Sequence, residues 1–223
     1  MIDIVEVIRT FISELDLSGA VISLSDDGTN TTLVLENSYH LRQYMTVTID
    51  SVDYEVVSAD AKNNNIVVPG VLASALTYSI ASPFFFHGSN YIVGYEFDNL
   101  PDESKLPMFY MESLIREDWG NEGSLYTTTP DFRFILADWA NYQDWQADDF
   151  VDKRLVGLRK LAGAIRDKSF EYNLFGSIEG IEVEQFYKFG VYKSNSGVID
   201  SLFNHTLSAV GMKMSIPILD CNC

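Results

Sequence analysis

The chain is poor in basic residues. Of its 223 residues only 15 are Lys or Arg, against 32 Asp or Glu, so the formal net charge is −17. Affinity for nucleic acid comes largely from Lys and Arg that neutralise phosphates, and the same residues attract a protein to an anionic membrane surface. The charge balance therefore argues against tight DNA binding and against binding to anionic membranes.

Cysteine is nearly absent. Its only two representatives, Cys221 and Cys223, are separated by a single residue. That spacing is poor geometry for a disulfide, and two thiolates are too few for a structural zinc site. We expect free thiols on a reduced, intracellular product with no metal and no cofactor. The stretch Met1–Asp16 carries acid within its apolar run, and no apolar run approaches ~18 residues, so neither a signal peptide nor a membrane-spanning helix is expected.

Motifs that carry catalytic chemistry are also missing. The sequence has no P-loop, GxSxG or GxGxxG, and its three histidines show no paired spacing such as HExxH. The acidic run Asp144, Asp148, Asp149 and Asp152 lacks the central glycine and terminal glutamate of a calcium loop, and helix capping explains it. We therefore predict no catalytic, cofactor-binding or metal-binding residue and no enzymatic activity.

The hydrophobic pattern changes period twice. Apolar residues recur at helical spacing from Ile4 to Leu15, which predicts an amphipathic helix. The next block alternates and is broken by turn residues, and it predicts five strands, Thr31–Glu36, Tyr44–Ile49, Val52–Ser58, Ile66–Val68 and Leu76–Ile80. A sheet of five short strands can pair its two edge strands by closing into a small barrel. We therefore expect residues 18–87 to form an inserted all-β barrel domain of the SH3-like or OB-like type.

Residues 88–223 return to a mixed pattern. Strands are expected at Tyr91–Phe97, Pro107–Ser113, Phe132–Trp139, Glu184–Val191 and Leu207–Ile218. A helical stripe covers Val151–Lys168, and a polar loop is expected over Glu117–Pro130 and a short helical turn over Val198–Phe203. We predict the α+β class. Residues 1–17 plus 88–223 would form the main domain, whose antiparallel sheet is flanked by the two helices.

Three consecutive phenylalanines, Phe84, Phe85 and Phe86, lie in the expected return linker Ser82–Gly88. Because successive side chains of a strand point to opposite faces, the three cannot all face one core. They are either a wedge between domains or part of a buried subunit contact, since aromatic residues are enriched in the cores of interfaces.

Charge is segregated along the chain. From Glu96 to Asp152 there are fourteen acidic residues, whereas the second helix carries the basic residues Lys153, Arg154, Arg159, Lys160, Arg166 and Lys168. We hypothesise that the first four of these meet the acidic segment of a neighbouring subunit and set register and partner choice. The alternative is that they pair within their own subunit and that the acidic segment is a solubilising face.

The order of elements resembles the tail-terminator and neck proteins of tailed bacteriophages. The features that carry the resemblance are the opening helix, the strand Phe132–Leu136, the helix Val151–Lys168 and a final strand, His205–Ile218, with its late Pro-Ile. The resemblance covers residues 1–16 and 90–223, and the simplest members lack an insertion like residues 18–87.

This resemblance implies a structural virion protein with no catalytic residues. It would form an oligomeric ring that closes or links the tail tube to the portal complex. Its partners would be copies of itself and other neck or tail proteins, while DNA passes through without being tightly bound. Two other classes stay open, namely a binding module whose barrel grips a carbohydrate or peptide, and a carboxylate-dependent hydrolase.

Overall fold

The computed structural model describes residues 3–89, 95, 97–99, 105–112, 116–122, 125–139, 155–193, 199–201, 203 and 207–220. The prediction of an α+β protein with mostly antiparallel sheets is confirmed. The chain divides into two compact units. Unit 1 consists of residues 1–15, 83–140 and 162–223, and unit 2 of residues 16–82 and 141–161.

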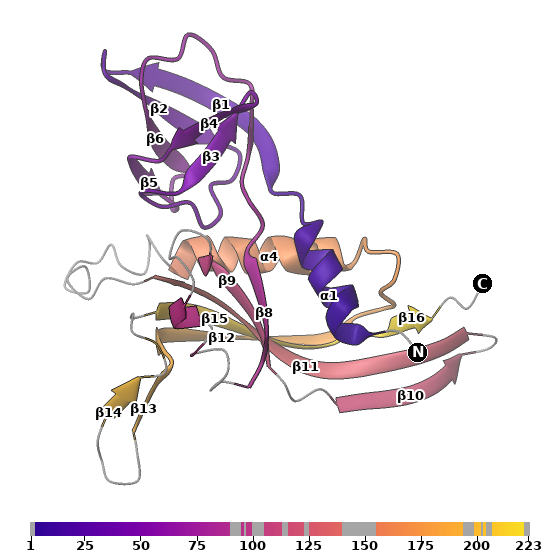
Figure 1. Cartoon of the computed structure of the whole chain (residues 1–223). Helices are drawn as coiled ribbons and strands as arrows, with labels where there is room; N and C mark the ends of the chain where they lie inside the picture. Colours follow the sequence, from indigo (N-terminus) through magenta and orange to yellow (C-terminus); the bar gives the residue numbers. More distant parts are fainter. Residues whose placement is uncertain are drawn as a thin grey trace. The chain divides into compact units, whose positions relative to one another are not determined.

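Unit 1 contains helix α1, Ile4–Ser13, and a sheet with the strand order β12-β15-β11-β9-β8, to which β10 and β16 add along β11 (Figure 1). The strands of this sheet are β8 (Phe84–Gly88), β9 (Met108–Glu112), β10 (Arg116–Glu122), β11 (Leu125–Trp139), β12 (Glu179–Phe189), β15 (Leu207–Ser215) and β16 (Ile218–Asp220). A separate pair is formed by β13 (Val191–Lys193) and β14 (Ile199–Ser201). Among the described strand pairs, only β8 with β9 is parallel.

Helix α1 begins where the sequence predicts. The Asp3 carboxylate caps it by accepting hydrogen bonds from the backbone N–H groups of Val5 and Glu6, at 3.0 and 3.3 Å. Its buried residues are Ile4, Ile8, Phe11 and Ile12, the predicted apolar stripe. The helix ends at Ser13 rather than Leu15.

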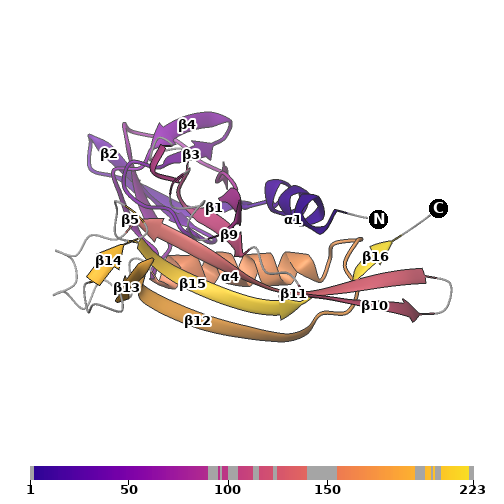
Figure 2. The same ribbon diagram turned by 60° about the horizontal axis from the view of Figure 1, so that its bottom comes forward.

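Strand β11 is paired along its whole length. On one edge it pairs with β15 and then with β16, which continues the same register from Asp131↔Ser215 to Tyr126↔Asp220. The interruption falls at Ile216-Pro217, because proline cannot donate to a ladder. On the other edge it pairs with β9 and then β10. Figure 2 shows β11, β15 and β12 side by side, with β10 extending along β11.

The sheet of unit 1 is apolar on both faces. Phe134 and Leu136 point to one face of β11 and Ile135 and Ala137 to the other, because side chains alternate. All four are at most 2% exposed. Each face therefore needs its own covering layer.

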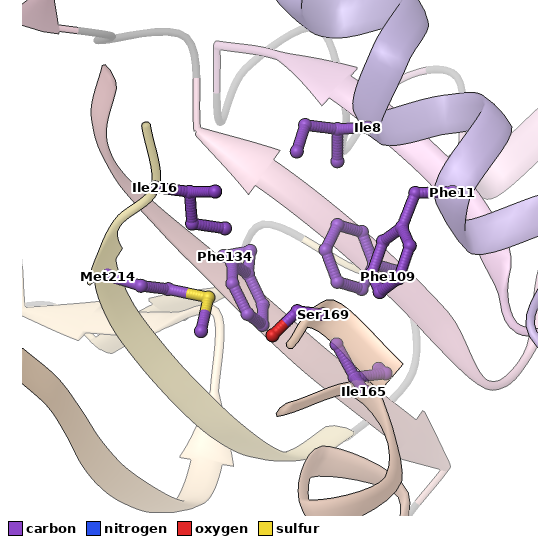
Figure 3. Close-up of a pocket in the computed structure, with 8 residues that line it drawn as sticks. All are labelled: Ile8, Phe11, Phe109, Phe134, Ile165, Ser169, Met214 and Ile216. Carbon is purple, nitrogen blue, oxygen red and sulfur yellow. The ribbon is translucent and has the colours of Figure 1, made fainter. Parts of the chain in front are cut away.

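The first face carries a small cavity of about 10 Å³ that is lined by residues of two helices (Figure 3). Ile8 and Phe11 come from α1, and Ile165 from α4, the helix Val156–Ser169. They meet Phe109 and Phe134 of the sheet. A cavity of this size holds one water at most, so it is a packing defect rather than a ligand site.

The second face is covered by a chain of phenylalanine rings. Consecutive ring centroids lie 4.8 to 6.1 Å apart in the order Phe84, Phe86, Phe97, Phe203, Phe189 and Phe186. Rings at this separation attract one another in edge-on or tilted arrangements. The chain runs from β8 at one edge of the sheet to β12 at the other.

Unit 2 contains a curled, half-barrel sheet with the strand order β4-β3-β7-β1-β2-β6-β5 (Figure 1). Its strands are β1 (Ser18–Asp26), β2 (Asn30–Leu35), β3 (Thr46–Ile49), β4 (Val52–Glu55), β5 (Ser58–Asp60), β6 (Asn65–Pro69) and β7 (Thr77–Ser79). The sheet has seven strands rather than five. Strand β1 escapes prediction because most of its side chains are exposed and it shows no clear alternation.

The first turns of α4 belong to unit 2. Lys160 donates hydrogen bonds to the carbonyl oxygen of Ala61 and to Oδ1 of Asn64. A Cβ at Gly157 would lie 2.5 Å from the carbonyl oxygen of Tyr39, so only glycine allows this close approach. The predicted boundaries of 18–87 and 88–223 therefore differ from the observed units at both ends, since β8 joins the sheet of unit 1 and residues 141–161 join unit 2.

Three further predictions in the main domain are wrong. Residues 117–130 are not a loop, because β10 pairs with β11 from Arg116↔Asp131 to Glu122↔Leu125. Val198–Phe203 contains strand β14 rather than a helical turn. Within the predicted strand Tyr91–Phe97, the described residues Tyr95 and Phe97 are helical.

We predict that Gly157→Ala lowers the thermal stability of the protein, whereas Gly163→Ala raises it. Both sites lie in α4, where Ala is intrinsically favoured over Gly by about 1 kcal/mol. The new methyl group at position 157 must displace the backbone of Tyr39, and overpacking of this kind costs about 1–3 kcal/mol. A methyl group at position 163 meets no atom within 4 Å. Equal shifts in the unfolding midpoint of the two variants would contradict the close approach.

Candidate subunit interface

The three predicted interface phenylalanines form strand β8 rather than a linker. The register Phe84↔Met108, Phe85↔Phe109 and Phe86↔Tyr110 places them at the edge of the sheet in unit 1. Their rings alternate between the two faces, as the sequence argument requires. Phe84 and Phe86 contact each other on the second face, and Phe85 stacks on Phe109 on the first face at 5.9 Å. All three therefore pack within unit 1.

The basic residues of α4 divide into different groups. Lys160 is half-buried and holds Ala61 and Asn64 within unit 2. Its burial lowers the pKa of the ammonium group, an effect that the nearby charge of Asp60 opposes. Arg159 is exposed and has no ion-pair partner in the part of the chain that the structure describes. Lys153 and Arg154 lie outside the described residues.

The last turn of α4 is different again. Arg166 pairs with Asp167 at 2.6 Å, and Lys168 pairs with Glu171 at 3.0 Å. These four side chains are about half exposed or more, so each pair adds little to stability. Of the four basic residues predicted to lie at an interface, the structure describes Arg159 and Lys160. Only Arg159 of these two is exposed, and it has no ion pair with a described residue.

The acidic segment Glu96–Asp152 is not a uniform wall. Asp138 is buried, and Glu112 lies 3.7 Å from Arg133. The buried Lys105 donates a hydrogen bond to the carbonyl oxygen of Phe97 and lies over the ring of that residue. Several charges of this segment therefore serve the interior of unit 1.

Arg133 is a cross-strand link that the sequence does not reveal. It pairs with Glu184 of β12 at 2.5 Å and lies 5.3 Å from the centre of the Phe186 ring. To do so it must reach past β15, where the intervening residue opposite Glu184 is Gly211. A Cβ at Gly211 would lie 2.9 Å from Phe186, so glycine leaves the space that this arrangement needs.

Exposed aliphatic residues gather around one turn of unit 2. Ile22, Val52 and Leu76 are 64, 52 and 72% exposed, and we call them the Asp50 patch. The backbone N–H of Val21 donates to the carbonyl of Leu76, which brings Ile22 and Leu76 together. Val52 follows the turn between β3 and β4, and that turn carries Asp50. The strand pattern gives no sign of this patch, because each residue lies at a strand end or bulge.

The Asp50 carboxylate fixes this turn. It accepts hydrogen bonds from the N–H groups of Leu76 and Thr77 and from the hydroxyl of Thr77, at 2.9 to 3.2 Å. Asp50 and Ser51 both have positive φ, at 45° and 71°, a conformation that costs energy outside glycine and persists where surrounding contacts impose it. The backbone hydrogen bonds from Thr77 and Leu76 hold the pKa of Asp50 below its ordinary value of 3.8.

Three large apolar residues of unit 1 are also exposed. Phe84, Trp139 and Val191 are 36 to 38% exposed, and we call them the apolar rim. Phe84 and Trp139 lie near the same end of the sheet. Phe84 pairs with Met108, which in turn pairs with Ala137, and Ala137 is two residues before Trp139 in β11. Leu207 of β15 pairs with Trp139 of β11 on one side and with Phe189 of β12 on the other. Val191 is two residues after Phe189 in the sequence.

Within the described residues there is no group of three or more His, Cys, Asp or Glu side chains that could hold a metal ion. The described helices are also too short or too polar to cross a membrane. Comparison with models of known protein families gives no match for this chain, and a search of curated proteins gives none either.

We predict that Lys160→Met lowers the free energy of unfolding by about 1–2 kcal/mol. The substitution removes the charged donor, so the carbonyl oxygen of Ala61 and Oδ1 of Asn64 both lose a hydrogen bond. Denaturant unfolding of the full chain measures the change. Arg159→Glu alters the adjacent exposed side chain of the same helix and should leave stability nearly unchanged. If Lys160→Met unfolds at the same denaturant concentration as the parent, the internal role of Lys160 is wrong.

We predict that Asp50 contributes to acid unfolding. Because its folded-state pKa is lower than 3.8, its contribution is fully present above that pH and is lost as the pH falls from 3.8 through the folded-state value. Asp50→Asn should therefore flatten the dependence of the unfolding midpoint on pH between about pH 5 and pH 2. Glu55→Gln removes one charge from neighbouring β4 without touching the turn and serves as the control. Identical acid profiles for the parent and Asp50→Asn would exclude the effect.

Proposed function

We propose that this chain is a structural component of a tailed-phage virion that assembles into a ring of its own copies. The ring lies at the head–tail junction or in the tail and closes or links the conduit through which DNA passes. Other neck or tail proteins bind to it. The passing DNA is not held tightly, because the chain is strongly acidic.

The observation that carries this proposal is the long sheet organised by β11. This strand has 15 residues, whereas most strands in globular proteins have about 3–10. It is flanked on both edges along its length, and the hairpin with β10 carries the sheet beyond the end of β9. An elongated sheet provides surface for neighbouring subunits, which a ring requires. The 10 Å³ cavity of unit 1, by contrast, is too small for a substrate.

The electrostatic part of the proposal now centres on Arg159. It is exposed on the only strongly basic stretch of an acidic chain, and Lys160 has an internal role instead. Arg159, with Lys153 and Arg154, would face the acidic segment of a neighbouring copy. A contact between two different patches is heterologous, which is the type of contact that closes into rings.

The finer architecture belongs to the same proposal. We take the curled sheet of unit 2 as a small barrel of the SH3-like or OB-like type, and the sheet of unit 1 as flanked by α1 and α4. The side chains of Ile8, Phe11 and Ile165 over the first face support the second point. Such an inserted barrel would serve to contact another virion protein.

Size-exclusion chromatography with light scattering, followed by negative-stain imaging, tests the proposal. We expect ring-shaped particles with several times the mass of one chain, alone or with neck and tail proteins. Arg159→Glu should weaken the assembly most at low salt, whereas Arg166→Glu, on the same helix but paired with Asp167, should not. A chain that stays monomeric and binds no neck or tail protein would contradict the proposal. A monomer with a ligand in the curled sheet would favour a carbohydrate- or peptide-binding module, and a hydrolytic activity would favour an enzyme.

A further inference from the structure

We propose that the outer edge of β12 binds an extended segment of another protein, which adds to the sheet of unit 1 as a further strand. The segment would carry Lys or Arg at alternating positions, with apolar residues between them. Strand β12 spans Glu179–Phe189 and is the last strand of its sheet on that side (Figure 2). This contact needs no ring and applies equally to a monomer.

The edge of β12 is long and open. In the part of the chain that the structure describes, β12 pairs with β15 alone, so its other edge has no strand partner there. The pairing is continuous from Ile181↔Met214 to Phe186↔Ala209, and the register shifts on either side of this stretch. We call residues 181–186 the β12 window. The N–H and C=O groups of an edge strand that point away from the sheet can pair with an incoming strand.

Two exposed glutamates lie on the second face of the β12 window. Glu184 is opposite Gly211, which is opposite Ile135, so Glu184 and its i−2 neighbour Glu182 share the face of Ile135. Residues directly opposite one another in neighbouring strands lie on the same face, and opposite charges in such pairs are stabilising. An added strand would therefore be favoured if it placed Lys or Arg opposite both glutamates.

The cations already near these glutamates lie on the inner side of the β12 window. Arg133 of β11 pairs with Glu184 at 2.5 Å, yet the Glu184 side chain is still 59% exposed. Lys213 of β15 is directly opposite Glu182. Both cations lie toward the centre of the sheet, so the two carboxylates are the outermost charges of the window. Cations of an added strand would approach them from the other side.

Val183 leaves the apolar layer of the first face unfinished. It is 53% exposed, although Met212, directly opposite in β15, is only 1% exposed. An aliphatic side chain opposite Val183 would remove this apolar surface from water, which is favourable. The β12 window therefore calls for the order basic, apolar, basic along the incoming strand.

A second copy of this chain does not fit the β12 window. Two windows paired antiparallel in their central registers would place Glu182 opposite Glu184, or Glu184 opposite its own copy, and like charges directly opposite are destabilising. Of the 15 Lys and Arg residues, only Arg166 and Lys168 are two positions apart, and both lie in helix α4. The chain offers no strand with the required alternation, so the occupant is a different protein.

Peptide binding to the full chain tests the contact. The probe is a short labelled peptide of repeated Val-Lys units, and fluorescence anisotropy measures its affinity. In one control peptide Glu replaces each Lys, and in another the same residues are reordered so that the alternation is lost. We expect the Val-Lys peptide to bind about tenfold more tightly than either control. Equal binding of the reordered peptide would indicate charge attraction without an added strand and would overturn the proposal.

Hydrogen exchange locates the bound peptide. The outward N–H groups of the β12 window exchange with water in the free chain, and they should exchange more slowly once they donate to carbonyl groups of the Val-Lys peptide. The protection should centre on residues 181–186. A peptide that binds without slowing exchange in this stretch would contradict strand addition.

Charge reversal in the β12 window gives a third readout. Glu182→Lys should weaken binding of the Val-Lys peptide about tenfold and strengthen binding of the Val-Glu peptide. Glu55→Lys makes the same change in net charge on β4, in unit 2, and should leave both affinities nearly unchanged. Circular dichroism confirms that each variant is folded. Where Glu182→Lys is not, Glu182→Gln replaces it and should weaken binding of the Val-Lys peptide. If the folded variant binds both peptides like the parent, β12 is not the site.

The ring and this contact can fail separately. A monomer that binds the Val-Lys peptide through β12 would exclude the ring and leave the added strand in place. Rings that bind the Val-Lys peptide no better than its controls would exclude the added strand and leave the ring. A chain that self-associates and is dissociated by the Val-Lys peptide would show that a second copy occupies the edge, which would overturn the assignment to a different protein.

Discussion

The sheet of unit 1 depends on a strand that is apolar on both sides. Phe134 and Leu136 of β11 require a cover on one face, and Ile135 and Ala137 require one on the other. Side chains of α1 and α4 lie over the first face, and a row of phenylalanine rings lies over the second. Both faces have to be covered, because an uncovered face would expose a long apolar surface to water. Side chains of Ile8, Phe11 and Ile165 contribute to the first cover, and the phenylalanines of β8 and β12 contribute to the second.

The phenylalanines of β8 show how one short strand can serve two cores. Phe86 belongs to the ring chain of the second face, and Phe85 stacks on the first face beneath the guanidinium of Arg9, 5.4 Å from its ring centre. A strand with apolar side chains on only one side could contribute to the apolar core on only one face of the sheet. The three aromatic residues therefore hold β8 at the sheet edge, where Phe84 is exposed, Phe85 is half-buried and Phe86 is buried.

Periodicity predicts those parts of the fold in which local pattern and burial agree. Helix α1 and strands β2 and β6 are examples, because their buried residues recur at the spacing of their element. Strands β9 and β15 are buried on both faces and are recognised instead as short, nearly continuous apolar runs. Strand β10 could not be predicted, since Gly120 and Asn121 suggest a turn but lie in a ladder opposite Thr127 and Tyr126. Pairing with a distant strand overrides such local preference.

The candidate interface was predictable only in part. The sequence singles out Phe84 and Arg159 only as members of two groups, the three phenylalanines and the basic residues of the second helix, and it cannot separate Arg159 from Lys160. Their difference arises because Lys160 meets Asn64, which is 96 positions away in the chain. The Asp50 patch has the same origin, since Leu76 and Asp50 are brought together by strand pairing across 26 positions. Contacts of this kind are properties of the folded chain and leave no local trace.

The two ends of the inserted strands meet each other in unit 2. Ser18 pairs with Ser79, and the N–H of Ile80 donates to the carbonyl of Leu17 at 3.2 Å. The chain therefore leaves α1 and returns to β8 through neighbouring backbone positions, separated by about one strand spacing of 4.8 Å. One pair of hydrogen-bonded positions therefore sets the spacing of the two crossings, whatever lies between β1 and β7. Lengthening, trimming or exchanging the loops between β1 and β7 would then leave the spacing of these two crossing strands unchanged.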